Sequence, residues 1–136
     1  MSRLPDWQSR LYNEIQARMN VPFQWGENDC LMFVSDMVLA VTGIDYAADY
    51  RDLYTDEDAA NNIMLQLTPE GTVTGIIDLF FDRIPVLQAS RGDLVARPSH
   101  PSPAAGICAG GGCYFVGPDG LFKWPLQSCI TAWRVK

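Results

Sequence analysis

Apolar residues recur at helical spacing near the start of the chain. Within residues 5–19 they stand every four positions, at Trp7, Leu11, Ile15 and Met19. This spacing places the four side chains on one face of an α-helix. The pattern therefore predicts an amphipathic helix over residues 5–19 with a single stripe facing the core.

The segment Cys30–Thr42 is apolar around most of a helical circumference. Asp29 stands directly before it and is a favoured N-cap residue, while Gly43 follows it and favours a left-handed helix end. A helix that is apolar on all sides is buried. We expect a central helix here, with the rest of the chain packed around it.

Two more helices are predicted before the pattern changes. Thr55 and Asp58 have the spacing of a capping box, which predicts a helix over residues 56–67. Residues 72–84 carry Val73, Ile76 and Phe80 on one side, which predicts a further helix.

The last third of the chain contains short apolar runs separated by Gly, Pro and Asp. These runs cover residues 93–97, 104–109, 113–116, 121–124 and 130–135. Such runs predict strands of a small antiparallel sheet. Helices followed by strands indicate the α+β class, and 136 residues suit a single domain over 1–136.

Composition narrows the classes of function. The chain is 48% hydrophobic, which is enough for a packed core, and has a net charge of −6. Phosphate recognition needs clustered Lys and Arg, so we expect neither nucleic acid nor an anionic membrane surface as a partner. No apolar run reaches the roughly 18 residues of a membrane span. The first residues lack the apolar region of a signal peptide, which predicts synthesis and folding in a cytoplasm.

The four cysteines are Cys30, Cys108, Cys113 and Cys129. Their spacing is long and irregular without a C-x-x-C pair, so we predict neither a metal site nor another cofactor. Cys108 and Cys113 are close enough in sequence to pair across a hairpin, although buried free thiols are the expected state in a reducing compartment.

Cys30 is the first candidate for chemistry. Backbone N–H groups and the helix dipole stabilise a thiolate at a helix N-terminus, whereas nearby acidic residues oppose it. Cysteine nucleophiles also need a base, most often His. The chain has one histidine, His100, which lies between prolines in a predicted loop.

A second candidate region follows the central helix. Tyr46, Tyr50 and Tyr54 stand at four-residue spacing beside Arg51, which suggests an exposed strip for contact with a partner. The surrounding stretch is acidic. It lacks the ligand pattern of a calcium loop, so we expect a solvated face or a patch for a basic partner.

Several short motifs together resemble a known family. Residues 23–30 read Phe-x-Trp-Gly-x-x-Asp-Cys, residues 92–95 read Gly-Asp-Leu-Val, and residues 105–107 read Ala-Gly-Ile before a glycine turn. In this order they resemble the NlpC/P60 cell-wall peptidases, which implies a papain-like α+β fold. Residues 42–56 and 132–135 further resemble NlpC/P60-like proteins encoded in phage tail modules.

The resemblance implies that Cys30 is the nucleophile. At the other catalytic positions of the family, this sequence has different residues. Phe23 stands where these peptidases place a tyrosine, Ala104 where they place the catalytic histidine, and Val116 near the third polar residue. The base is therefore missing from its expected position.

These observations predict a structural or assembly component of a bacteriophage tail tip with a degenerate, non-catalytic NlpC/P60 fold. It would be made in the host cytoplasm, reside in the virion tail and contact other tail-tip and hub proteins. The alternative is an active cysteine peptidase that cuts peptidoglycan stem peptides during DNA entry. In that case His100, or a residue of a neighbouring subunit, would serve as the base for Cys30.

Overall fold

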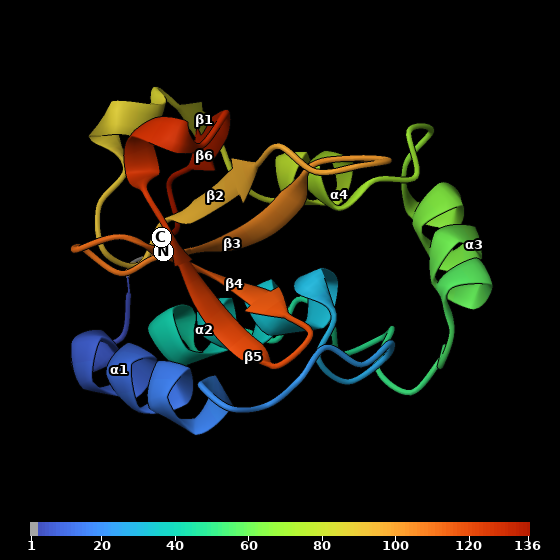
Figure 1. The fold of residues 1–136 in the computed structure, drawn as a ribbon, viewed down its shortest axis with the longest axis horizontal. Helices are drawn as coiled ribbons and strands as arrows, with labels where there is room; N and C mark the ends of the chain where they lie inside the picture. Colours follow the sequence, from blue (N-terminus) through green and yellow to red (C-terminus); the bar gives the residue numbers. More distant parts are fainter. Residues whose placement is uncertain (1–2) are drawn as a thin grey trace.

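The computed structural model describes residues 3–136 and shows an α+β fold (Figure 1). Within these residues, the helices are α1 (Trp7–Arg18), α2 (Cys30–Thr42), α3 (Glu57–Leu67) and α4 (Val73–Asp78), with short 3-10 helices η1 (Val86–Gln88) and η2 (Leu126–Ser128). The strands are β1 (Arg83–Ile84), β2 (Leu94–Arg97), β3 (Ala104–Cys108), β4 (Cys113–Gly117), β5 (Gly120–Trp124) and β6 (Thr131–Trp133). They form one antiparallel sheet in the order β1-β6-β2-β3-β4-β5.

The central helix is the one that the sequence predicts. Asp29 caps α2 by accepting a hydrogen bond from the Met32 amide at 2.9 Å, and Gly43 ends the helix in the left-handed conformation. One side of α2 packs on α1 and another on β3 (Figure 1). Phe33, Met37 and Val41 are fully buried there, so this helix forms the centre of the hydrophobic core.

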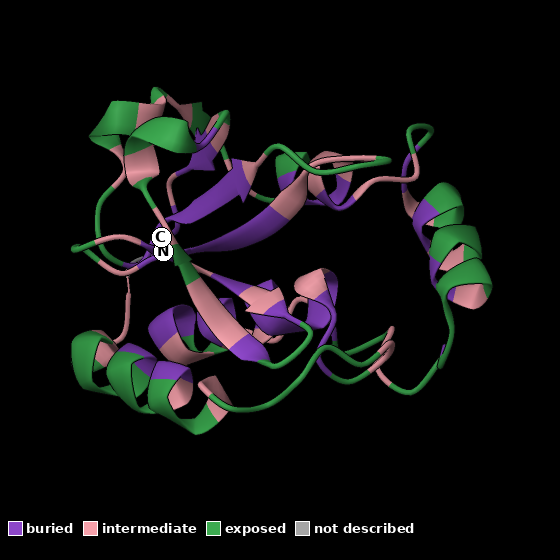
Figure 2. Cartoon of the chain, in the orientation of Figure 1, coloured by how far each residue is buried: buried purple, intermediate pink, exposed green. Residues whose placement is uncertain are grey.

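β2 and β3 are buried along most of their length, as their purple colour in Figure 2 shows. Side chains alternate across a strand. Leu94, Ala105 and Ile107 accordingly face the core around α2, while Val95 and Cys108 face a second cluster under η1 and η2. β2 and β3 therefore each contribute side chains to two separate apolar layers.

The segment after residue 72 differs from its prediction. The expected helix over residues 72–84 ends at Asp78, and the chain then turns into β1, which sequence reasoning missed. The carboxylate of Asp78 accepts hydrogen bonds at 2.8 Å from Arg83 and from the indole of Trp133, and β1 pairs with β6. Contacts with the end of the chain thus replace the last helical turns.

Smaller differences lie at the ends of elements. The cap of α3 is Asp56, which accepts from the Ala59 amide at 2.8 Å, rather than Thr55. The last strand is Thr131–Trp133, shorter than the predicted run over 130–135. No helix within residues 3–136 has the length and apolar character to span a membrane.

A buried carboxylate joins the two ends of the chain. Asp93 accepts hydrogen bonds from Arg3 at 2.9 Å, from the Val135 amide at 3.1 Å and from the Ser90 amide at 3.0 Å. Arg3 also donates to the Val135 carbonyl at 2.9 Å, so the terminal segments lie side by side (Figure 1). Burying Asp93 is tolerable because its oxygens are all paired.

Gly106 is required where β3 approaches β4. A Cβ atom at this position would meet the carbonyl oxygen of Tyr114 and lie 2.6 Å from the ring of Phe115. We expect Gly106→Ala to lower the free energy of unfolding by about 1–3 kcal/mol, the usual cost of overpacking. Urea unfolding followed by tryptophan fluorescence measures this change.

Gly111→Ala is the matched control, because no atom lies within 4 Å of its Cβ position and its φ is outside the left-handed region. Equal unfolding midpoints for the two variants would show that β3 and β4 do not approach as closely as described.

Candidate functional site

The N-terminus of α2 is held by the carboxylate of Asp29. Besides the Met32 amide, this carboxylate accepts hydrogen bonds at 2.8 Å from the Gly26 amide and from the hydroxyl of Tyr54. Three segments therefore meet at one buried side chain: the turn before α2, the helix itself and the loop that precedes α3. Burial, followed by the negative charge of Asp29, raises the pKa of Tyr54.

Cys30 begins α2 and packs against the apolar core that also contains Ala105 of β3. Burial raises the pKa of its thiol to about 11, and the negative charge of Asp29 adds to this effect. The amides of Ala105, Cys30 and Leu31 stabilise the thiolate, but they do not outweigh the burial. At neutral pH the thiol is therefore protonated and a poor nucleophile.

The structure does not bring His100 to Cys30. His100 is exposed in the loop between β2 and β3, and no hydrogen bond within residues 3–136 joins its imidazole to the thiol. The residue beside Cys30 on β3 is instead Ala105, the neighbour of Ala104. The described residues thus supply no base at the candidate nucleophile.

The two remaining positions of the resemblance are also without catalytic groups. Phe23 is exposed and packs edge-on against Trp25, with ring centroids 4.9 Å apart. Val116 on β4 packs on the core. Neither side chain has an atom that can donate or accept a proton.

The strip of Tyr46, Tyr50, Arg51 and Tyr54 is not one exposed surface. Tyr54 is 4% exposed, and its hydroxyl points to Asp29. Arg51 pairs with Asp36 at 2.6 Å and with Asp45 at 2.9 Å. The hydrogen bonds from Arg51 lower the pKa of Asp45. The expectation of exposure was therefore wrong for Tyr54, because the buried Asp29 needs its hydroxyl.

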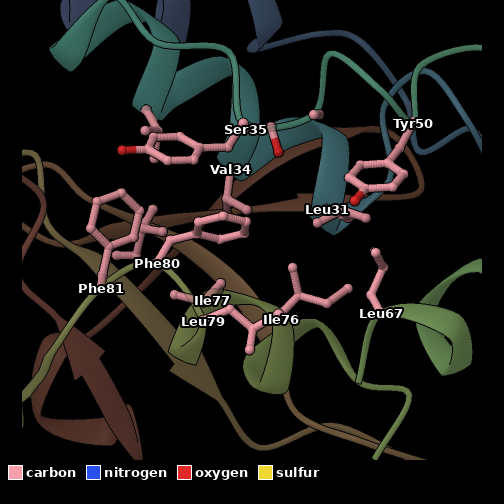
Figure 3. Close-up of a pocket in the computed structure, with 14 residues that line it drawn as sticks. Leu31, Val34, Ser35, Tyr50, Leu67, Ile76, Ile77, Leu79, Phe80 and Phe81 are labelled. Carbon is pink, nitrogen blue, oxygen red and sulfur yellow. The ribbon is translucent and has the colours of Figure 1, made fainter. Parts of the chain in front are cut away.

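Tyr46 and Tyr50 instead line an apolar groove between α2 and α4 (Figure 3). Buried side chains of α2, from Leu31, Val34, Ser35 and Val38, form one wall of this groove. Ile76, Ile77 and the residues after α4 form the other wall. Tyr46 packs against Phe80 and Phe81, with ring centroids 4.9 and 5.3 Å apart. The open space is about 70 Å³, which is room for roughly two water molecules.

Sequence reasoning missed this groove. Its rim includes Leu79 and Phe80, which are 59% and 45% exposed. The signal is present as the run Leu79-Phe80-Phe81, but the pattern predicts Phe80 and Phe81 on the apolar side of a helix over residues 72–84. Because α4 ends at Asp78, these residues lie in a turn and two of them face solvent.

Acidic residues follow the groove along the α2–α3 loop and the start of α3. Residues 45–58 contain six acidic side chains and one basic side chain, Arg51. Asp49 and Asp52 are exposed and form no ion pair within the described residues. Among residues 3–136, no group of three or more His, Cys, Asp and Glu side chains is arranged to hold a metal ion.

The bond between Tyr54 and Asp29 gives a direct test of this site. We expect Tyr54→Phe to lower the free energy of unfolding by about 1.5–3 kcal/mol, because a hydrogen bond to a buried carboxylate is lost. Tyr50→Phe is the control, since the Tyr50 hydroxyl has no hydrogen-bond partner within residues 3–136, and it should change the value by less than about 0.5 kcal/mol. Denaturant unfolding measures the free energy of unfolding of both variants. A similar decrease in the two variants would contradict the role assigned to Tyr54.

Comparison with known proteins yields one match. Residues 2–135 match the family described as Domain of unknown function (DUF6950). No curated protein and no solved structure matches the chain. Because the match spans nearly all 136 residues, the chain belongs to the DUF6950 family.

Proposed function

We propose that this chain is a non-catalytic structural component of a bacteriophage tail tip, built on a degenerate NlpC/P60-type, papain-like fold. The observation that carries the proposal is the environment of Cys30. The residue stands at the head of a buried helix beside a strand, as the resemblance requires, yet its neutral thiol meets Ala105 and no imidazole. A tail location and tail-protein partners rest on the resemblance.

A chain without catalytic activity would act by binding other proteins through its surface, and the groove between α2 and α4 is the binding site that we propose. The groove between α2 and α4 is too small for a typical small-molecule ligand, whose pockets measure roughly 300 Å³ or more. The groove has room for part of one apolar side chain. Ser35, Tyr46 and Tyr50 bring hydroxyl groups to its lining, which is otherwise apolar.

Charge indicates the chemistry of the occupant. The exposed carboxylates of Asp49 and Asp52 lie on the loop that supplies Tyr46 and Tyr50 to the groove, and the net charge of the chain is −6. Complementary charges speed encounter and select partners. The occupant is therefore a segment of another tail protein with one apolar anchor residue and neighbouring Lys or Arg residues.

The inactive state of Cys30 can be tested with iodoacetamide over a range of pH, read by peptide mass spectrometry. Below about pH 9 we expect Cys30 of the folded protein to remain unmodified, because its thiol ionises only near 11. The unfolded thiol ionises near ~8.5. The neutral buried thiol therefore stabilises the folded protein below the pKa of the unfolded thiol, and this stabilisation is lost as the pH rises towards the pKa of the folded thiol, about 11.

His100→Ala is the control and should leave the Cys30 profile unchanged. Rapid alkylation of Cys30 at pH 7 that disappears in His100→Ala would establish a working dyad, favour the peptidase and overturn the proposed function.

Docking can be tested with a photo-reactive phenylalanine analogue at position 80, in assembled particles. We expect a cross-link to another tail protein, at a segment with an apolar residue flanked by Lys or Arg. Position 12 on α1 is the control, because Tyr12 is 63% exposed but lies outside the groove. Cross-links to a second copy of this chain, to an acidic segment, or in equal yield from both positions would contradict the assigned occupant.

A further inference from the structure

Three cysteines converge on the side of the sheet that faces away from α2. Cys108 ends β3, Cys113 begins β4 and Cys129 follows η2. All three are buried free thiols in the cluster that also contains Phe115. This cluster is separate from Cys30 and from the groove, and the proposed function makes no use of it.

The backbone places Cys108 and Cys113 directly opposite each other. The Cys108 amide donates to the Asp93 carbonyl at 2.8 Å, and the Cys108 carbonyl accepts from the Gly92 amide at 2.9 Å. Both groups therefore point away from β4. The next pair along the hairpin is hydrogen-bonded, from the Ala109 amide to the Gly112 carbonyl at 2.8 Å.

Antiparallel ladders alternate between hydrogen-bonded and non-hydrogen-bonded pairs, so Cys108 and Cys113 form a pair of the second kind. The Cα atoms of such a pair are about 4.5 Å apart. Disulfides span Cα separations of about 4.4–6.8 Å. The β3–β4 hairpin therefore accommodates a disulfide at this position without a change in register.

The surroundings of Cys108 favour its reactivity. The thiol of Cys113 donates to the Cys108 sulfur and lowers its pKa, against the opposing effect of burial. The Gly110 amide and the charge of Arg91 act in the same direction as Cys113. Gly110 and Gly111 are exposed at the tip of the hairpin, next to Cys108, which gives a small oxidant a short approach.

The thiol of Cys113 lowers the pKa of Cys129 as well, so the backbone geometry decides between the two possible partners of Cys113. Cys129 is placed less well for a disulfide. It lies on a coil segment, and its thiol donates to the Pro125 carbonyl of its own turn at 3.8 Å. No strand register holds its Cβ opposite another cysteine.

We propose that Cys108 and Cys113 form a peroxide-oxidisable dithiol site, which closes to a cross-strand disulfide at the base of the β3–β4 hairpin. The inference stands independently of the proposed function. Its co-substrate is a small hydroperoxide such as hydrogen peroxide, and Cys129 remains a free thiol.

The chemistry balances in two steps. The Cys108 thiolate attacks one peroxide oxygen, the O–O bond breaks, and the departing hydroxide takes up a proton to form water. The product is a sulfenic acid on Cys108. The Cys113 sulfur then attacks the Cys108 sulfur, the S–O bond breaks, and a second water leaves with the Cys113 proton. Two thiols and one peroxide thus yield one disulfide and two waters.

The disulfide would strengthen the pairing between β3 and β4, which extends over few residues. The ladder between β3 and β4 contains two residue pairs, Ile107 with Tyr114 and Cys108 with Cys113. A covalent bond at the second pair would hold the two halves of the sheet together where few backbone hydrogen bonds do so.

Tryptic mapping of the intact chain tests the proposal. Trypsin does not cleave between Arg97 and Pro98, so residues 92–123 form one peptide with both cysteines, while Cys129 lies in residues 124–134 and Cys30 in residues 19–51. After peroxide treatment, free thiols are alkylated under denaturing, non-reducing conditions. We expect peptide 92–123 to lose two hydrogens and carry no alkyl group, while the Cys30 and Cys129 peptides are fully alkylated.

Two variants test the order of the steps. In Cys113→Ser the resolving thiol is absent while a hydroxyl donor remains beside Cys108, so dimedone should trap a sulfenic acid on Cys108. In Cys129→Ala the loss of two hydrogens from peptide 92–123 should persist. Circular dichroism before treatment confirms that each variant is folded.

Three results would overturn the inference. These are full alkylation of peptide 92–123 after peroxide treatment, a cross-link between peptides 92–123 and 124–134, and equal oxidation of Cys30. Urea-unfolded protein is the reference for reactivity: Cys108 should react with peroxide no faster there than Cys30 or Cys129, because its advantage depends on its neighbours in the folded hairpin.

Discussion

The carboxylate of Asp29 is the interaction on which the arrangement around α2 depends. It receives donors from the helix, from the preceding turn at Gly26 and from Tyr54. Burying a carboxylate is costly unless its oxygens are paired, so these three donors must lie where they do. The bond to Tyr54 fixes the end of the α2–α3 loop against α2, and Tyr46 and Tyr50 of the same loop line the groove.

The same carboxylate acts against catalysis at Cys30. A helix N-terminus would by itself favour a thiolate. Here burial of the thiol, followed by the negative charge of Asp29, has the larger effect, and the pKa of Cys30 rises to about 11. Stability of the central helix and reactivity of its first residue therefore oppose each other at this position, and no histidine compensates within residues 3–136.

The sheet gives the chain two chemically different interiors. The face towards α2 contains aliphatic side chains and Trp133 and is closed by helices. The cluster on the opposite side contains three thiols together with Phe115, under short coil and 3-10 segments. Strand alternation places Cys108 and Cys113 on this face, because neighbouring residues such as Ile107 and Cys108 point to opposite faces. Cys129 joins them from the coil after η2. The thiols are consequently grouped with one another and kept apart from Cys30.

Local sequence signals determined much of the fold. The caps and apolar pattern of α2 predicted both of its ends, and the Gly- and Pro-bounded runs predicted five of the strands, since these features act over a few residues. The identity of Cys30 as a helix-start residue was also predictable.

Only the tertiary structure decided which distant residues meet. It ended α4 at Asp78 through contacts with Arg83 and Trp133, and it exposed Leu79 and Phe80 at the groove. It also buried Tyr54 against Asp29, kept His100 away from Cys30, and placed Cys108 opposite Cys113. These outcomes depend on pairing between residues far apart in the chain or on strand register, and neither property is encoded in the periodicity of a single segment.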